Sequence, residues 1–314
     1  MRHATLRQMQ VFDAVARHLS FSKAARELHL TQPAVSMQIK QLEGLAGLPL
    51  FEQVGRVLYL TAAGTSLLDH ARAILGAVAD AEEAMAALRG QRTGGFRIGV
   101  VSTAKYFAPS LLSAFTAGYP GIEVSLQVAN RRQILADLAE NRVDLALMGR
   151  PPTDMKVNDV VFAAHPHAVI AAPTHPLARK RASLSALDGE TLLVREQGSG
   201  TRALMERLLA EHGVTPGRLI EMASNETIKQ AVMAGMGVSF LSVHTIGLEV
   251  SVGRLLVLDM EDTPVERQWH VVWREGKRLL PIADAFVGFM KDNGERLIEE
   301  AVHPAPTGRR TAKA

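Results

Sequence analysis

The chain has 314 residues, of which 47% are hydrophobic and 21% are charged, a composition typical of a folded globular protein of two or three domains. It has no cysteine, which excludes disulfides and thiolate metal sites, and its formal net charge is only +3. The N-terminal stretch is interrupted by charges, unlike a secretion signal, and no stretch reaches the roughly 18 apolar residues of a membrane helix. We therefore expect a cytoplasmic protein with no membrane association.

The charges are unevenly distributed along the chain. Residues 1–60 contain seven basic and four acidic side chains, and the final stretch GRRTAKA contains three basic side chains and no acid. The part between these segments is therefore slightly acidic. A basic N-terminal module on a slightly acidic body indicates an anionic partner for that module.

The first 30 residues predict two short helices. Apolar residues recur at helical spacing over residues 6–16. Either Ser20 or Ser22 can cap a second helix over residues 22–30.

Pro33 falls in the middle of a continued apolar spacing, where it would break a helix. If Thr31 is an N-cap, Pro33 lies in the first turn of a third helix, where no partner awaits its missing N–H. The second and third helices are then joined by a tight turn at residues 29–31. The sequence therefore predicts a helix-turn-helix arrangement.

The third helix has two different faces. Val35, Ile39 and Leu42 are expected to point into the core. The outward face carries short hydroxyl and amide groups and a lysine, which suit base edges and phosphates in a DNA groove, although a merely solvated face has the same composition. On the helices of this module we predict as DNA-contacting residues Ser22, Thr31, Gln32, Pro33, Ser36, Met37, Lys40 and Gln41.

Residues 47–64 alternate apolar and polar side chains around a glycine, which predicts a small β-hairpin, or wing. Arg56 at the tip of this wing is placed to contact phosphate or the minor groove, and it completes the predicted DNA-contacting set.

Thr61 then caps a long helix with an alanine-rich apolar seam, whose steps of three and four residues are typical of a coiled coil. We expect this helix to pair with a second subunit; the alternative is that it packs on its own domain. The seam consists of Ala71, Ile74, Val78, Ala81, Met85 and Leu88.

After a glycine-rich boundary at residues 90–95, strand-like runs alternate with helical ones, which predicts an α/β fold with mostly parallel strands in two lobes around a cleft. The predicted domains are a DNA-binding domain at 1–60, a linker and dimerisation helix at 61–92, a ligand-binding domain at 93–302 and a disordered tail at 303–314. Within the ligand-binding domain, we expect the first lobe at about 93–162 and 267–302, and the second at about 163–266.

Five segments of the N-terminal module together resemble the winged helix-turn-helix of LysR-type transcriptional regulators. They are FDAVA from Phe12, SFSKAAREL from Ser20, TQPAVSMQIKQLE from Thr31, PLFE from Pro49 and LTAAG from Leu60. The resemblance implies an all-α winged helix-turn-helix followed by a two-lobed, periplasmic-binding-protein-like α/β domain. It also implies a regulator that binds and bends promoter DNA as a dimer of dimers and senses a small molecule in the cleft.

Three further segments, EQVG (52–55), VVSTAKYFAP (100–109) and ANRRQILADLAENRVDLALMGRPP (129–152), resemble the subgroup that activates Calvin-cycle, RuBisCO-encoding operons. This implies no bound cofactor but a small-molecule effector, drawn from phosphorylated sugars, phosphoenolpyruvate, or NADPH and related nucleotides. It also implies a homodimer through the linker helix, a homotetramer, and RNA polymerase as a partner. One departure is that many members have several wing arginines where this chain has only Arg56.

The body itself predicts an anion site, independently of the resemblance. Hydroxyls and Lys105 follow a predicted strand and precede a helix, where backbone N–H groups favour an anion. The segment EQGSGTR (196–202) repeats this design, and Arg202 can bind a carboxylate or phosphate bidentately; a capped helix without ligand is the alternative. Arg150 also follows a strand end and could line the cleft, but an arginine in such a position is more often on the surface, so we do not select it. The predicted effector-contacting residues are Ser102, Thr103, Lys105, Asn130, Arg131, Gly149, Glu196, Gly198, Ser199, Gly200, Thr201, Arg202 and Asn225.

Other functions find less support. His165 and His167 flank a proline before a predicted strand, without an acidic or histidine partner at ligand spacing, so we expect no metal site. The sequence has no phosphate-binding lysine loop, nucleophile elbow or catalytic cysteine, so we expect no enzyme. A small-molecule-binding protein of the solute-binding type remains the alternative, and the N-terminal module argues against it.

Overall fold

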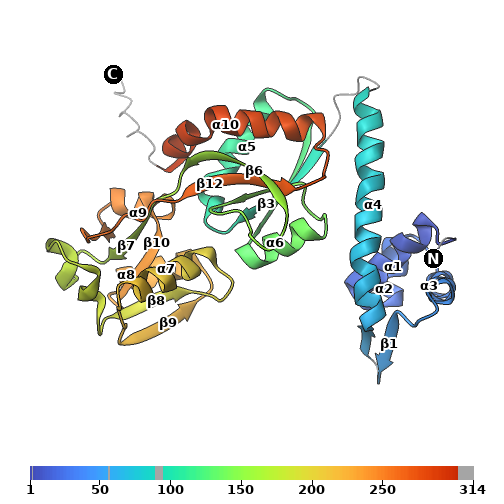
Figure 1. The fold of residues 1–314 in the computed structure, drawn as a ribbon, viewed down its shortest axis with the longest axis horizontal. Helices are drawn as coiled ribbons and strands as arrows, with labels where there is room; N and C mark the ends of the chain where they lie inside the picture. The colour runs from blue at the N-terminus through green and yellow to red at the C-terminus, as the bar shows by residue number, and fades with distance from the viewer. Residues whose placement is uncertain (2, 56, 89–94, 303–314) are drawn as a thin grey trace, which may run out of the picture. The chain divides into compact units, whose positions relative to one another are not determined.

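The computed structural model describes residues 1–314 except residues 2, 56, 89–94 and 303–314. The predicted glycine-rich boundary therefore falls almost entirely, and the predicted tail entirely, outside the described residues. The chain divides into an N-terminal unit, which contains helices α1–α4 and strands β1 and β2, and a larger C-terminal unit, which contains all later elements (Figure 1).

The N-terminal unit begins with three short helices, α1 (Leu6–His18), α2 (Phe21–Glu27) and α3 (Gln32–Ala46). The Thr5 side chain caps α1, and of the two serines that could cap α2, Ser20 is the one that does so. The apolar faces of the three helices meet in one core, so each short helix is stabilised by packing on the others. Its fully buried side chains include Val11, Phe12, Val15, Val35 and Leu42.

The start of α3 confirms the prediction made from Pro33. Thr31 is the N-cap, and its hydroxyl oxygen accepts a hydrogen bond from the Ala34 N–H at 3.4 Å, while Pro33 lies in the first turn. In the preceding turn the Leu30 N–H donates to the Ala25 carbonyl at 2.8 Å. The two helices and this turn form a helix-turn-helix.

Strands β1 (Phe51–Val54) and β2 (Val57–Leu60) form the predicted antiparallel hairpin. The carboxylate of Glu43, near the end of α3, accepts from the Leu50 N–H at 2.8 Å and so fixes the first strand against that helix. Arg56 at the tip lies outside the described residues.

Helix α4 (Ala62–Leu88) follows the hairpin directly. The Gly64 N–H donates to Thr61 Oγ1 at 3.0 Å, which caps the helix as predicted. A Cβ at Gly64 would overlap the Leu50 carbonyl oxygen, so only glycine lets α4 begin this close to the hairpin. Further along, the predicted seam divides. Ala71 is fully buried in the core of its own N-terminal unit, so the prediction that it pairs with a second subunit was wrong. Ile74 and Met85 are 43% and 50% exposed.

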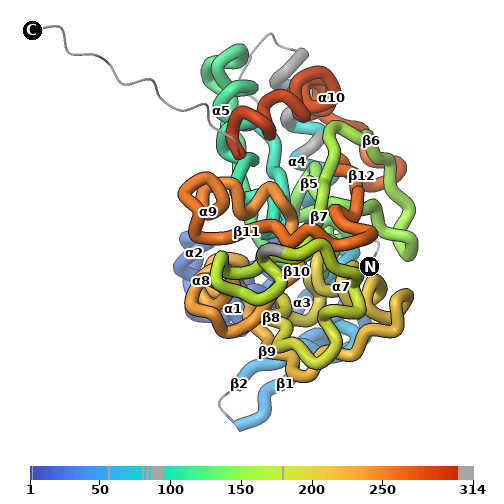
Figure 2. Tube along the Cα trace, turned by 90° about the vertical axis from the view of Figure 1, so that its left-hand side faces the viewer, coloured from blue at the N-terminus to red at the C-terminus, as the bar shows by residue number. Residues whose placement is uncertain are grey.

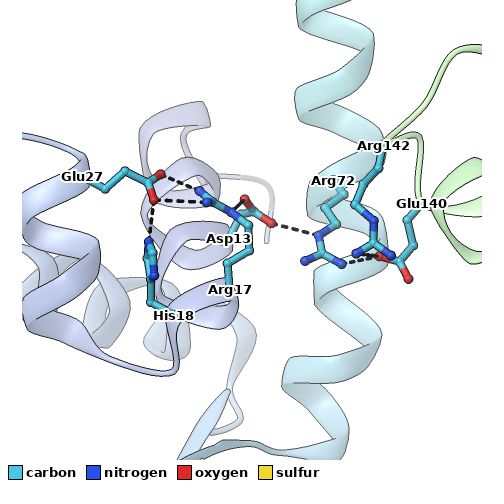
Figure 3. A network of polar contacts seen from close by, with 7 residues as sticks. All are labelled: Asp13, Arg17, His18, Glu27, Arg72, Glu140 and Arg142. Carbon is cyan, nitrogen blue, oxygen red and sulfur yellow. Dashed lines mark hydrogen bonds and ion pairs between the residues drawn. The ribbon is translucent and has the colours of Figure 1, made fainter. Parts of the chain in front are cut away.

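Charge pairs join three helices of the N-terminal unit (Figure 3). Arg17 pairs with Asp13 at 2.9 Å on α1 and with Glu27 of α2 at 2.6 Å, and Arg72 of α4 donates to Asp13 at 2.9 Å. The hydrogen bond from Arg17, with a second from His18, lowers the pKa of Glu27 to about 2. These pairs hold α2 and α4 on α1 and so position the helix-turn-helix.

The first lobe of the C-terminal unit is a five-stranded sheet in the order β4-β3-β5-β12-β6. Strand β3 runs parallel to both its neighbours, and β12 runs antiparallel to both of its own. Helices α5 and α10 cover one face of the sheet and α6 covers the other (Figure 1). The bounds are β3 (Gly95–Val101), η1 (Ala104–Tyr106), α5 (Ala108–Ala117), β4 (Glu123–Ala129), α6 (Arg131–Ala139), β5 (Leu145–Met148), β6 (Val157–Ala164), β12 (Gln268–Arg274) and α10 (Pro281–Val302).

The second lobe is a five-stranded sheet in the order β11-β7-β10-β8-β9. Alternate side chains of β8 serve its two faces, because Leu192 and Val194 pack with α7 whereas Leu193 packs with α8. The bounds are β7 (His167–Ala171), η2 (Pro176–Arg179), η3 (Leu184–Leu187), β8 (Thr191–Arg195), α7 (Gly200–Glu211), β9 (Arg218–Met222), α8 (Asn225–Met233), β10 (Val238–Ser242), η4 (Val243–Thr245), α9 (Gly247–Ser251) and β11 (Leu256–Val257).

The expectation of mostly parallel strands is only half right, because both sheets are mixed. The strands that enter each lobe from the other one, β12 and β7, run antiparallel to their neighbours. The chain crosses between the lobes twice, and the crossing segments pair with each other. The His165 N–H donates to the Arg267 carbonyl at 2.7 Å, and the Val265 N–H donates to the His167 carbonyl at 2.8 Å. Figure 2 shows the two lobes, one carrying α5 and α10 and the other carrying α7 and α8, on either side of these crossings.

Candidate nucleic-acid interface and effector cleft

Helix α3 presents a polar face to solvent. Of the nine residues predicted to contact DNA, eight lie within the described residues, and all eight are exposed, whereas Val35, Ile39 and Leu42 on the opposite face are at most 2% exposed. Seven of the eight lie on α3 or at its N-cap, and Ser22 lies on α2. Their hydroxyl and amide groups therefore form one outward face of the kind that can read base edges.

The electrostatics of this face suit a phosphate backbone. The first turn of α3 contains no acidic residue, so the positive end of its helix dipole is not neutralised there. Lys40 is exposed further along the same face. The side chain of Gln41 is held against α1, because its oxygen accepts from Gln8 Nε2 at 3.3 Å. The role of Arg56 stays a prediction, since that residue is not described.

A cavity of about 730 Å³ lies between the two lobes of the C-terminal unit. It is lined by residues from the ends of β3 and β5, the first turns of α6 and α7, and the crossing segments. A cleft at the carboxyl ends of strands is the usual ligand site of such α/β folds. Nine of the predicted effector residues line it: Ser102, Thr103, Arg131, Gly149, Gly198, Ser199, Gly200, Thr201 and Arg202.

Lys105 and Asn130, which the sequence also placed at the effector, do not line the cavity. The Lys105 ammonium lies 3.6 Å from the carboxylate of Glu226, and the Asn130 oxygen accepts from the Gln133 N–H at 3.0 Å at the start of α6. Each side chain is therefore engaged by its own neighbours, and both residues are removed from the candidate site.

Glu196 and Asn225 do not line the cavity either. Instead, the side chains of both accept hydrogen bonds from the Arg195 guanidinium. This arginine is 2% exposed, and its guanidinium also donates to Ser102 Oγ at 2.9 Å, across the two lobes. Asn225 is the first residue of α8, which Ser224 caps. Glu196 and Asn225 therefore position Arg195 and are not candidate ligand contacts.

Arg202 lines the cavity, but two carboxylates neutralise it. Its guanidinium pairs with Glu206 at 2.7 Å and also with Glu221. The hydrogen bonds that Arg202 donates, first to Glu206 and then to Glu221, raise the pKa of its guanidinium. An anion in the cleft would have to compete with both carboxylates for this side chain, so Arg202 is a poorer anion ligand than the sequence suggested.

Three other arginines of the cavity wall are not neutralised in this way: Arg150, Arg207 and Arg267. Their guanidinium groups form no hydrogen bond or ion pair with the described residues. Burial, and then the charges of Arg207 and Arg150, lower the pKa of Arg267, against a smaller opposite effect of the Glu211 carboxylate, so Arg267 is near both other cations. Unpaired cations that converge on a cavity favour an anion there.

Arg131 adds a further cation, whose guanidinium donates to the Arg150 and Pro151 carbonyls. The sequence predicted Arg131 correctly as a cavity residue. Arg150 was considered as a cleft residue but not selected, and its side chain is both exposed and part of the cavity wall. Arg207 and Arg267 were not considered. The position of Arg150, directly after a glycine at a strand end, was the only sequence signal for it. Arg207 and Arg267 come from a helix and a crossing segment, where no local pattern marks a ligand site.

Direct contacts join the two lobes beside the cavity. The Arg132 guanidinium donates to the Gln197 carbonyl at 2.7 Å, and the Tyr106 hydroxyl donates to Glu226 at 2.5 Å. Burial and the Glu226 carboxylate raise the pKa of Tyr106, so its hydroxyl stays protonated. Contacts of this kind break or form when the lobes move, so a ligand between the lobes can influence their arrangement.

Comparison with known protein families assigns both units. The model "Bacterial regulatory helix-turn-helix protein, lysR family" matches residues 6–65, and the model "LysR substrate binding domain" matches residues 89–295. The chain belongs to the LysR family of transcriptional regulators. LysR-type regulators bind promoter DNA and small-molecule effectors, and they are not enzymes. The helix-turn-helix and the two-lobed fold described above are those of this family.

Relatives within the LysR family are close. The chain is 64% identical to the regulator CbbR of Rhodospirillum rubrum over 293 residues, which cover 93% of this chain and 98% of that one. It is 48% identical to the RuBisCO operon transcriptional regulator of Allochromatium vinosum over 296 residues, 94% of this chain and 98% of the other.

A solved structure resembles the C-terminal unit. The regulatory domain of Synechocystis CcmR in complex with 2-PG is 41% identical, has a TM-score of 0.61, and covers 63% of this chain and 96% of its own. Among the described residues of the present LysR-type regulator, no helix is both long and apolar enough to cross a membrane.

Proposed function

We propose that this LysR-type regulator activates a carbon-fixation operon and that an anionic metabolite in the inter-lobe cleft sets its effect on promoter DNA. The names of the relatives support the operon. The single observation that supports the anion is the set of three arginines, Arg150, Arg207 and Arg267, which line a cavity of about 730 Å³ and form no ion pair with a carboxylate of the described residues. The proposal places the protein in the cytoplasm, where promoter DNA is found.

The number of unpaired cations favours a compact effector with more than one negative charge, such as a phosphorylated carboxylate. Arginine binds both carboxylate and phosphate through parallel N–H groups. The effector changes DNA binding only if it binds two lobe arrangements with different affinity. The inter-lobe contacts of Arg132 and Tyr106 are candidates for what differs between those arrangements.

Thermal melting of the full-length protein tests the effector class, with 2-PG, phosphoenolpyruvate, NADPH and inorganic phosphate as probes. A specific ligand at about a hundred times its Kd adds about 2.7 kcal/mol of stability and raises the midpoint. We expect Arg267→Ala to weaken binding at least tenfold, about 1.4 kcal/mol. The matched control Arg254→Ala, an exposed arginine outside the cavity, should bind as the wild type does. Equal binding by both variants would contradict the proposed site.

Footprinting on the promoter of a carbon-fixation operon tests the regulatory part. The footprint or the DNA bend should change when the ligand that raises the melting midpoint is added. A ligand that binds tightly but leaves footprint and bend unchanged would reject the switch and leave the binding site standing.

The proposed assembly is a homodimer through α4, with a tetramer and RNA polymerase as further partners. The exposed seam residues Ile74 and Met85 support the pairing, because large apolar groups on a solvent face mark an interface. Replacing both by Glu should shift the protein toward the monomer in sedimentation. The control Leu248→Glu removes an apolar side chain that is 70% exposed on another element, and it should leave the assembly unchanged. A dimer of unchanged stability in the seam variant would place the interface elsewhere.

A further inference from the structure

The wall of the cleft contains a histidine whose ring is held rigidly. His165 lies on the segment that crosses from β6 to β7, lines the cavity, and is 4% exposed. Its ring stacks on the indole of Trp269 from β12, with 3.7 Å between ring centroids and 14° between planes. The stacking fixes the ring plane, so the directions of its two nitrogens are fixed as well.

Neither ring nitrogen of His165 has a hydrogen-bond partner among the described residues. The neighbouring histidines differ, because His167 Nδ1 lies 3.1 Å from the His165 carbonyl and His244 accepts from the Trp269 indole N–H at 3.0 Å. A buried polar group without a partner destabilises the folded state. The His165 ring lies on the wall of a ligand cavity. We therefore infer that its missing hydrogen-bond partner is an atom of the bound ligand.

The groups that face the ring are neutral or positive. They are His167 on β7, His244 on η4, Arg267 on the second crossing segment, and the uncharged Trp269. Burial, and then His167, His244 and Arg267, lower the pKa of His165 well below its ordinary value. The ring is therefore neutral near pH 7 and keeps one N–H to donate.

Gly149, directly after β5, lies close to one ring nitrogen. A Cβ at this position would lie 2.7 Å from His165 Nδ1. Gly149 itself lines the cavity. Because Gly149 has no side chain, His165 can lie directly against this part of the cavity wall.

We propose that His165 contacts the effector, donating a hydrogen bond from its ring to an anionic oxygen, and that this contact links effector binding to proton uptake. The inference rests on the proposed anionic effector and names a further ligand residue for the same cleft. A negative charge beside a buried imidazole favours the charged ring, which then donates a stronger hydrogen bond. Effector affinity therefore rises as the pH falls.

Calorimetric titration of the full-length protein with 2-PG tests the proposal between about pH 6 and about pH 8, because the proposed anionic contact raises the pKa of His165 toward the ordinary range of histidine. Buffers of different ionisation enthalpy give the number of protons taken up on binding. His165→Phe keeps a ring to stack on Trp269 but has no N–H, so affinity should fall at least about tenfold. His165→Gln can donate but cannot gain a proton, so it should lack the proton uptake of the wild type. His212→Gln, an accessible histidine outside the cavity, is the matched control and should retain it.

The outcomes separate this inference from the proposed function. Any ionisation of 2-PG itself is common to all variants and cancels in the comparison. If the wild type binds 2-PG and His165→Phe binds it equally well, or His165→Gln takes up the same protons, the inference is overturned and the effector site stands. If His165→Phe does not fold, the comparison with His165→Gln still decides. If the wild type binds none of 2-PG, phosphoenolpyruvate, NADPH or inorganic phosphate, the effector site and this inference both fail.

Discussion

At the scale of single residues, the addition of one methyl group at Gly149 should weaken effector binding and leave DNA binding unchanged. Gly149→Ala places a Cβ 2.7 Å from His165 Nδ1, so the ring must move or the strand end must shift, at a cost of about 1–3 kcal/mol. We expect weaker 2-PG binding in calorimetry and an unchanged gel shift on promoter DNA without ligand. Gly288→Ala, on α10 with no atom within 4 Å of its Cβ position, is the control. An unaltered 2-PG affinity in Gly149→Ala would contradict the expected crowding at His165.

On the DNA-binding face, Gln32 and Ser36 are the side chains best placed to discriminate bases. Replacing either by Ala should weaken binding to the specific promoter by roughly 1–3 kcal/mol if it makes a good base contact, and should weaken binding to random DNA much less. Competition gel shifts at fixed salt measure both affinities. Gln230→Ala, an exposed glutamine on α8, is the matched control. Equal losses on both kinds of DNA would show that these side chains do not read bases.

Which residues could be predicted depended on whether the signal is local. Thr31 and Pro33 interact within one helical turn, so their spacing in the sequence was enough to place the start of α3. Arg150 and Arg267 are separated by more than a hundred residues and meet only because the chain crosses twice between the lobes. Arg202 could be located, but its contact with Glu221 could not be predicted, because Glu221 lies on β9 and is brought to α7 only by the fold.

At the scale of elements, the contact between the start of α4 and the wing should set the stability of the N-terminal unit. Gly64→Ala forces a Cβ into the Leu50 carbonyl, so we expect a loss of about 1–3 kcal/mol or more. Gly44→Ala on α3 has open space at its Cβ position and should gain about 0.5–1 kcal/mol from helix propensity. Urea unfolding followed by circular dichroism measures both. Equal stability of the two variants would mean that α4 can begin elsewhere.

The helices were predicted more reliably than the sheets. Helices α1, α3 and α4 could be predicted because their apolar spacing and their caps involve residues that are close together in the sequence. Strand direction is not local, because β7 and β12 have the apolar composition of buried strands whichever way they run. Their antiparallel pairing follows from the two crossings, and no residue in either strand specifies it.

At the scale of the whole molecule, buried histidines should make stability depend on pH. Burial, with Arg267 and His244, lowers the pKa of His167 to about 3, whereas unfolding returns it to about 6.5. Between these values the unfolded state binds more protons, so stability falls as the pH is lowered, by at most about 1.4 kcal/mol per pH unit for this residue. Tryptophan fluorescence in urea reports the C-terminal unit through Trp269. His167→Gln should reduce the slope and His70→Gln, exposed on α4, should not; equal slopes would contradict the assignment.

The paired crossing segments also restrict how the lobes of this regulator can move. Backbone hydrogen bonds run in both directions between His165 and Arg267, at 2.7 and 3.2 Å, and between His167 and Val265, at 3.0 and 2.8 Å. Sliding one lobe along the other would break all four, whereas a rotation about the two segments preserves them. Bound and free forms should therefore differ by an angle, with the axis passing close to His165. A rotation of this kind also changes the distances between the lobes, so the contacts of Arg132 and Tyr106 across them would change with it.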